Sequence, residues 1–169
     1  GLGPRLTPYH FNMEAAHSTA RPGDSLSICG IGADITGSRH SDRTAVGFKF
    51  HTPDGIISYV CDTDRSDRVV KAYEGSRILI LPVTRPTKAR IRCHLCTEDA
   101  VSFAETIRPE LILFAHMGVR MIQDGPEKEA AYVESRTGIR TVAAKDLMNV
   151  RISENIDISM TETLSRMDK

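Results

Sequence analysis

The sequence lacks several features that would assign it at once to a functional class. Lys and Arg together equal Asp and Glu at 22 each, so the 169-residue chain has no net charge. That balance excludes a global electrostatic footprint for nucleic acid or an anionic membrane. The longest apolar runs, at 78–82 and 111–115, have the length of a strand and fall far short of the roughly 18 residues of a membrane span. We therefore expect a soluble protein.

Motifs that bind nucleotides or activate a serine are also missing. The glycines at 23, 30, 32 and 37 do not form the strand-to-helix loop that holds phosphates in dinucleotide and P-loop sites. There is no nucleophile elbow, no internal repeat and no low-complexity segment. With 40% apolar and 26% charged residues, the chain has the composition of one globular domain.

The cysteine content is low and does not suggest a disulfide framework. Cys29, Cys61, Cys93 and Cys96 occur without a secretory hydrophobic segment, which indicates reduced thiols and a cytoplasmic protein. The Cys93-x-x-Cys96 pair brackets His94 and allows a metal-knuckle or redox interpretation. A second pair at metal spacing is absent, so we favour small buried apolar side chains instead.

What the sequence does contain is an alternating α/β order. We expect one domain over residues 1–152 and, over 153–169, a polar tail that is loosely attached or forms a terminal helix. Because the chain begins at Gly1, we also expect it to be truncated at that end. Apolar periodicity, turn residues and caps predict strands at 25–29, 31–36, 45–50, 56–61, 78–81, 111–115 and 141–144, helices ending near 73 and covering 98–107 and 127–136, and a loop at 82–92.

Three polar side chains fall where predicted strands begin or end, and a fourth precedes a predicted helix. His40 precedes the outgoing strand of the predicted hairpin at 45–61 and Asp62 follows its return strand, so antiparallel pairing would bring both to one edge. His116 follows the apolar run 111–115, and His94 precedes the helix at 98–107. Imidazole and carboxylate groups suit zinc, manganese or iron. Taken singly, each residue has a structural alternative as a hydrogen-bonded histidine, a turn or a cap.

The predicted loop at 82–92 concentrates positive charge in an otherwise neutral chain. It carries Arg85, Lys88, Arg90 and Arg92. Solvated loop charge is the favoured interpretation, and an anion site is the alternative.

These residues carry a family resemblance when they are taken together. The segments 40–50, 55–63, 94–100 and 116–118 resemble, in order and spacing, the C-terminal half of a metallo-β-lactamase-fold hydrolase. The chain is most similar to archaeal-type metal-dependent hydrolases related to the tRNA 3′-processing endonuclease, ribonuclease Z, and to phosphodiesterases. The resemblance covers roughly residues 23–152. It implies an α/β fold that forms part of an αββα sandwich, chiefly its C-terminal sheet with flanking helices.

The resemblance also implies roles for the four side chains. His40 corresponds to a metal ligand, Asp62 to the carboxylate that bridges two metal ions, and His116 to the last histidine ligand. His94 corresponds to the histidine that stabilises charge or protonates the leaving group, so that Asp62 and His94 would be the catalytic residues. In such enzymes two metal ions, zinc or else manganese or iron, generate a hydroxide that attacks a phosphodiester or related ester.

One departure from the family is large. Its His-x-His-x-Asp-His motif, which supplies most metal ligands, does not occur in this sequence. We therefore expect weak metal binding by this chain alone. We also expect a partner that covers the inner face of the sheet: the N-terminal half, a second chain that carries it, or a second copy of this chain in a homo-oligomer. Three hypotheses remain: part of a dinuclear hydrolase, a non-catalytic structural subunit with a degenerate site, or a mononuclear enzyme that uses all four side chains.

Overall fold

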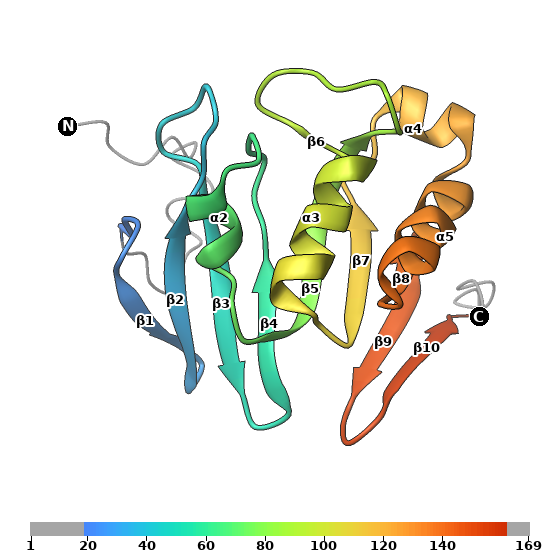
Figure 1. The fold of residues 1–169 in the computed structure, drawn as a ribbon. Coiled ribbons are helices and arrows are strands. Elements are labelled where there is room, and N and C mark those ends of the chain that lie inside the picture. Colours follow the sequence, from blue (N-terminus) through green and yellow to red (C-terminus); the bar gives the residue numbers. More distant parts are fainter. Residues whose placement is uncertain (1–18, 162–169) are drawn as a thin grey trace, which may run out of the picture.

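The structure is a computed structural model that describes residues 19–161 as one large mixed sheet with helices packed on it (Figure 1). The strand order is β1-β2-β3-β4-β5-β7-β8, β6 pairs with β5, and β9 and β10 form a separate two-stranded sheet. The strands are β1 (Ser25–Ile28), β2 (Ile31–Gly37), β3 (Val46–Thr52), β4 (Gly55–Tyr59), β5 (Ser76–Arg85), β6 (Leu95–Cys96), β7 (Leu111–Ala115), β8 (Arg140–Ala143), β9 (Met148–Ile152) and β10 (Ile156–Met160). The helices are α2 (Asp67–Lys71), α3 (Thr97–Ile107), α4 (Val119–Asp124) and α5 (Pro126–Thr137).

The first four strands form an antiparallel meander, and the rest of the large sheet is parallel. The turn 53–54 joins β3 to β4 with Thr52 opposite Gly55, as the sequence predicted. From β4 onward, the chain crosses through helices to the parallel strands β5, β7 and β8. Parallel neighbours end at the same edge of a sheet, so the loops after β4, β5 and β7 meet there.

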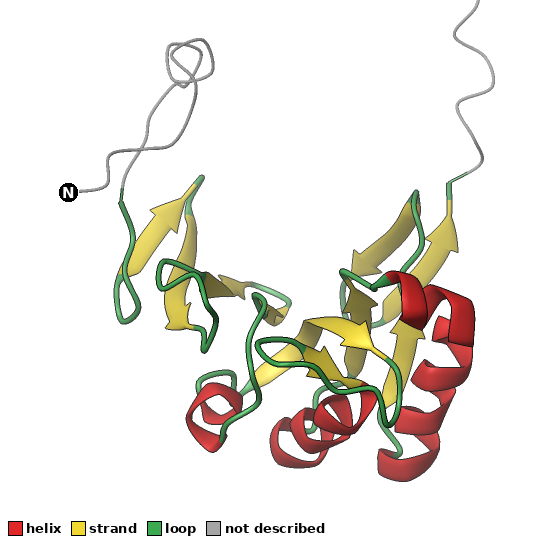
Figure 2. Cartoon of the chain, turned by 90° about the horizontal axis from the view of Figure 1, so that it is seen from above, coloured by secondary structure: helices red, strands yellow, loops and turns green. Residues whose placement is uncertain are grey.

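Helices α2, α3 and α5 cover one face of this sheet (Figure 2). In α3, Ala100, Phe103 and Ala104 recur at the spacing of one helix face and are buried. They pack with Leu79, Leu81 and other side chains of the same sheet face into the larger core cluster. Ser66 caps α2 and Gly138 ends α5 in the left-handed conformation, both as the sequence predicted. No helix in the described part of the chain is long and apolar enough to cross a membrane.

The opposite, inner face of the sheet is apolar as well. Cross-strand register places Phe48 opposite Tyr59 and Phe50 opposite Ile57, and the rings of the two phenylalanines stack. The same row continues through Ile80, which pairs with Tyr59. These side chains are only partly buried, and Tyr59 is 41% exposed. The inner face is therefore an apolar surface that the described chain covers incompletely.

The β9–β10 hairpin covers part of this inner face. Its apolar side chains pack against Ile78, Leu111 and Leu113. Arg77 anchors its turn by donating to the carbonyl oxygens of Ser153 and Glu154, while its guanidinium also pairs with the Glu110 carboxylate. Residues 156–160 therefore form a strand, and the expected tail or terminal helix is wrong there; 162–169 lie outside the described residues.

Other boundaries also differ from the prediction. Strand β5 continues to Arg85 because its last residues pair with β6, so the expected loop begins later than residue 82. The N-cap of α3 is Cys96, not Thr97, and Asp99 completes the cap by accepting the Cys96 backbone N–H at 3.0 Å. Helix α4 and the short strand β6 have too few periodic residues to be recognised in the sequence.

Candidate metal centre

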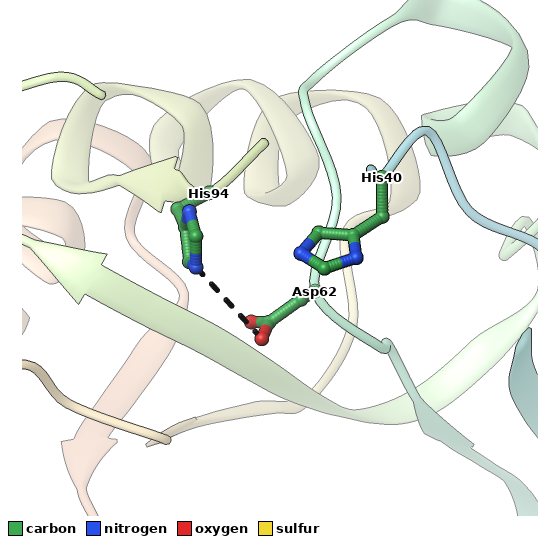
Figure 3. A group of neighbouring side chains, drawn as sticks. All are labelled: His40, Asp62 and His94. Atoms are coloured by element: carbon green, nitrogen blue, oxygen red, sulfur yellow. Dashed lines mark ion pairs between the residues drawn. The ribbon is translucent and has the colours of Figure 1, made fainter. Parts of the chain in front are cut away.

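Four loops bring the predicted site residues to the carboxyl edge of the parallel strands. His40 lies in the β2–β3 connection, Asp62 lies three residues beyond β4, His94 immediately precedes β6, and His116 immediately follows β7. The hairpin argument that placed His40 beside Asp62 is correct, because potential ligand atoms of His40, Asp62 and His94 all lie within 4.8 Å of one another. Figure 3 shows the two imidazole rings on either side of the carboxylate.

The Asp62 carboxylate is the centre of this group. Its Oδ2 lies 3.0 Å from Nε2 of His116 and 3.9 Å from Nε2 of His94. The rings of His40 and His94 meet edge to face with their centroids 5.7 Å apart. All four side chains singled out from the sequence therefore share one site.

Hydrogen bonds fix the orientation of two imidazole rings. Nδ1 of His94 lies 3.0 Å from the carbonyl oxygen of Arg92, which can only accept, so Nδ1 carries the hydrogen and Nε2 keeps its lone pair facing Asp62. In His40, Nδ1 accepts the backbone N–H of Asp42 at 3.1 Å, which leaves the hydrogen of the neutral ring on Nε2. A metal that bound His40 through Nε2 would require the ring hydrogen to move to Nδ1, and the bond from the Asp42 N–H would then be lost.

The side chains gathered at this site fit a divalent metal. Asp62 Oδ1 is buried and has no hydrogen-bond partner among the described residues. A buried carboxylate oxygen without a partner is costly, and a cation is one of the few groups that can satisfy it beside an imidazole lone pair. Zinc, manganese and iron all bind carboxylate and imidazole ligands, and this site offers one carboxylate and three imidazoles.

The loop that carries His116 has a constrained backbone. His116 adopts a left-handed conformation with φ of 48°, which costs energy in a residue other than glycine. Two residues later, a Cβ on Gly118 would lie 2.7 Å from the carbonyl oxygen of Thr84, so only glycine fits this approach to β5. Together, the turn and the close packing hold the imidazole of His116 beside Asp62.

Two residues next to Asp62 organise the site, and the sequence did not reveal their role. Thr63 accepts the backbone N–H of Arg39 at 2.8 Å, directly before His40. Asp64 accepts the backbone N–H of Cys93 at 2.6 Å, directly before His94. Neither side chain caps α2, because Ser66 supplies that cap. The sequence signal for this role is the length of the polar segment before α2, which is greater than a helix cap needs.

The side chains of the cysteine pair and of the basic loop do not belong to the group of possible ligands. Cys96 is buried and its thiol donates to Asp99, and burial raises the pKa of Cys96 to about 12, so it stays a thiol at neutral pH. A buried thiol that donates to a helix-cap carboxylate agrees with the interpretation of Cys96 as a small structural side chain. Arg90 forms an ion pair with Asp99 at 2.6 Å, so one charge of the basic loop is already compensated within the chain.

Sequence comparison gives a relative but no family model. No protein-family model matches the chain. An uncharacterised protein of Methanocaldococcus jannaschii, MJ1374, is 32% identical over 142 residues, which are 83% of this chain and 53% of the relative. The chain therefore spans about half the length of the curated relative that it matches.

Solved structures with the same arrangement have low sequence identity. The metallo-β-lactamase fold protein YhfI of Bacillus subtilis matches with a TM-score of 0.66 at 15% identity, over 75% of this chain and 52% of YhfI. The metallo hydrolase Igni18 of Ignicoccus hospitalis matches with a TM-score of 0.59 at 17% identity, over 85% and 60%. The short form of human tRNase Z matches with a TM-score of 0.54 at 19% identity, over 73% and 42%. The predicted fold is confirmed: this chain has the metallo-β-lactamase fold over the part that these structures share with it.

Proposed function

We propose that this chain forms the metal-binding C-terminal portion of a hydrolase that cleaves a phosphodiester or a related ester. The observation that carries the proposal is the convergence of three imidazoles, those of His40, His94 and His116, on the Asp62 carboxylate, whose buried Oδ1 lacks a partner among the described residues. Neighbours of this fold include a metallo hydrolase, a diphosphatase of the PhnP family and tRNase Z. Those names support hydrolysis as the chemistry and a phosphate ester as the bond.

Each side chain has a task in this proposal. Asp62, His40 and His116 would hold the metal, with Asp62 placed to bridge two ions when further ligands are present. A divalent metal there supplies Lewis acidity towards the scissile group. His94 faces the same point, and in the neutral ring with its hydrogen on Nδ1 the Nε2 lone pair could accept a proton and return it to a leaving oxygen. Zinc is the proposed metal, with manganese or iron as alternatives, because imidazole predominates among these ligands.

Metal binding by the Asp62→Asn variant tests the proposal. The amide keeps the size of the side chain but loses the negative charge, so we expect zinc binding measured by titration calorimetry to be abolished. Asp34→Asn is the matched control, since Asp34 lies on β2 and contacts Ser25 and His51 instead of the cluster. Equal zinc affinity in wild type and Asp62→Asn would overturn the metal site and favour a non-catalytic subunit.

We also propose that a second β-sheet covers the inner face, supplied by a polypeptide segment that carries the missing metal ligands. The β9–β10 hairpin already packs on one end of this face, and the exposed row that includes Phe48, Phe50 and Tyr59 continues the same surface. Apolar surfaces of this kind mark interfaces. The M. jannaschii relative is about twice as long as the matched region, which leaves room for such a sheet.

Native mass spectrometry of the protein purified from its own source tests this partner. We expect the chain to occur with, or within, a polypeptide that has the His-x-His-x-Asp-His motif, in the cytoplasm, where the four cysteines stay reduced. A homodimer buried through the inner face, or a stable monomer that binds no other chain, would contradict the proposal.

A further inference from the structure

The loop that carries His94 is held in place by carboxylates along its length. Residues 86–94 connect β5 to β6 through turns and contain no helix or strand. Four acidic side chains accept hydrogen bonds from this loop. Glu129 accepts from Thr87 and Glu98 accepts from Lys88. Asp99 accepts from Arg90 and Asp64 accepts from Cys93. Three of these acidic side chains belong to α3 or α5, and only Asp64 comes from the strand end that also carries Asp62.

The Asp64 contact lies next to the imidazole. Its Oδ1 accepts the backbone N–H of Cys93 at 2.6 Å. Cys93 adopts a left-handed conformation with φ of 65°, unusual for a residue with a side chain. This conformation turns the chain so that the carbonyl oxygen of Arg92 meets Nδ1 of His94 at 3.0 Å. The hydrogen bond from the Cys93 N–H to the Asp64 carboxylate thus offsets the cost of the left-handed conformation of Cys93. That conformation in turn sets the tautomer of the His94 ring.

The same segment reaches the other histidine loop. The Asp64 backbone N–H donates to the carbonyl oxygen of Arg39 at 2.8 Å, and Thr63 accepts the Arg39 N–H. Asp62, Thr63 and Asp64 therefore connect three separate parts of the chain at consecutive positions. A shift of this segment would move the carboxylate and both imidazoles as one unit.

We infer that Asp64 is the positioning residue of the site: through the Cys93 backbone N–H it holds His94 with Nδ1 protonated and Nε2 directed at Asp62. The expected effect on zinc affinity rests on the proposed metal site, whereas the positioning of His94 concerns only residues of this chain. The possible ligand atoms of His94 lie within 4.8 Å of those of His40 and Asp62, so a metal held by this group would also meet His94. Removing a hydrogen-bonded partner of a metal-contacting residue typically changes metal affinity about 10–100-fold. Because Asp64 reaches His94 only through the Cys93 backbone, we expect an effect of about tenfold from Asp64→Ala.

Three variants of the full 169-residue chain separate positioning from general stability. Asp64→Ala removes the acceptor, and Asp64→Asn retains an oxygen that can accept the Cys93 N–H. Glu98→Ala is the matched control, because it removes the bond from a carboxylate to the Lys88 N–H in the same loop but away from His94.

The first readout needs no metal. In Asp64→Ala we expect the Cys93 amide to exchange at least about tenfold faster, and ¹⁵N NMR of the imidazole to show that the Nδ1-protonated form of His94 is no longer dominant. Asp64→Asn should restore both signals, and Glu98→Ala should leave both unchanged. Wild-type exchange and an unchanged tautomer in Asp64→Ala would overturn the inference, as would an equal effect of Glu98→Ala.

The second readout is zinc affinity by titration calorimetry. We expect Asp64→Ala to bind zinc about tenfold or more weakly than wild type, and Asp64→Asn to lie within about threefold of it. If wild type binds no zinc while the tautomer still responds to Asp64→Ala, the proposed function fails and the positioning role stands. If wild type binds zinc and Asp64→Ala binds it equally well, the inference fails and the metal site stands.

Discussion

The two faces of the large sheet differ in what covers them, although the strands supply both with apolar side chains. The helix-covered face belongs to a core cluster of eighteen buried residues, whereas the cluster on the inner face has three. Phe103 on α3 is fully buried, while Tyr59 on the inner face is 41% exposed. Hydrophobicity of a strand therefore does not tell which of its faces the same chain will cover.

Chain connectivity explains the difference. Each crossover from β4 to β5, from β5 to β7 and from β7 to β8 joins parallel strands, and such connections are right-handed almost without exception. Because the strands follow in one direction, every crossover helix lies on the same side of the sheet. The other side receives only the β9–β10 hairpin and needs a cover from elsewhere.

The largest effect should come from truncating a side chain on the helix-covered face. Phe103→Ala leaves a cavity in a closed core, and we expect it to lower the free energy of unfolding by about 3–5 kcal/mol. Tyr59→Ala on the inner face should cost less than about 1 kcal/mol in the chain alone. Urea unfolding of both variants measures the contrast, and similar losses in the two would show that the inner face is already covered in solution.

Detaching the β9–β10 hairpin should have an intermediate effect. Arg77 donates five hydrogen bonds, to Glu110 and to the carbonyl oxygens of Asp54, Ser153 and Glu154. Arg77→Met keeps much of the apolar stem and removes all of them, with an expected loss of about 2–3 kcal/mol. Hydrogen exchange should accelerate in β9 and β10 before it does in β5 and β7. Uniform acceleration in all four strands would mean that the hairpin is not a separable cover.

The smallest expected effect is a pH dependence confined to the helix layer. Burial raises the pKa of Glu129, but the hydrogen bonds that its carboxylate accepts, first of all from the Thr87 hydroxyl, together lower that pKa by more. The pKa of Glu129 therefore lies below its usual value of 4.5. A lowered pKa in the folded state stabilises the protein above the unfolded value, and this contribution is lost as the pH falls through the folded pKa. Glu129→Gln should therefore lose less stability than wild type between about pH 7 and about pH 3. Urea midpoints at both pH values give the comparison, and an identical acid loss in the two proteins would rule out this role for Glu129.

The sequence by itself determined most of the elements and the edge at which the site lies. Period-two alternation and the turn at 53–54 identified the β3–β4 hairpin, and the uninterrupted apolar run 111–115 identified an interior strand. These signals are local, because each depends on neighbouring residues alone. His40, Asp62 and His116 were found because polar side chains at the ends of such strands are few, and His94 was found because it precedes a predicted helix.

Only the tertiary structure decided what lies around those side chains. The hydrogen bond between Asp64 and Cys93 joins residues 29 positions apart, and no pattern within either segment announces it. Strand β10 was missed because five residues with two exposed polar side chains gain their order from packing against Ile78, Leu111 and Leu113. Local periodicity in the sequence shows which face of a strand or helix is apolar. Which face is covered, and which carboxylate reaches which loop, depends on contacts between distant residues that form only when the whole sheet is assembled.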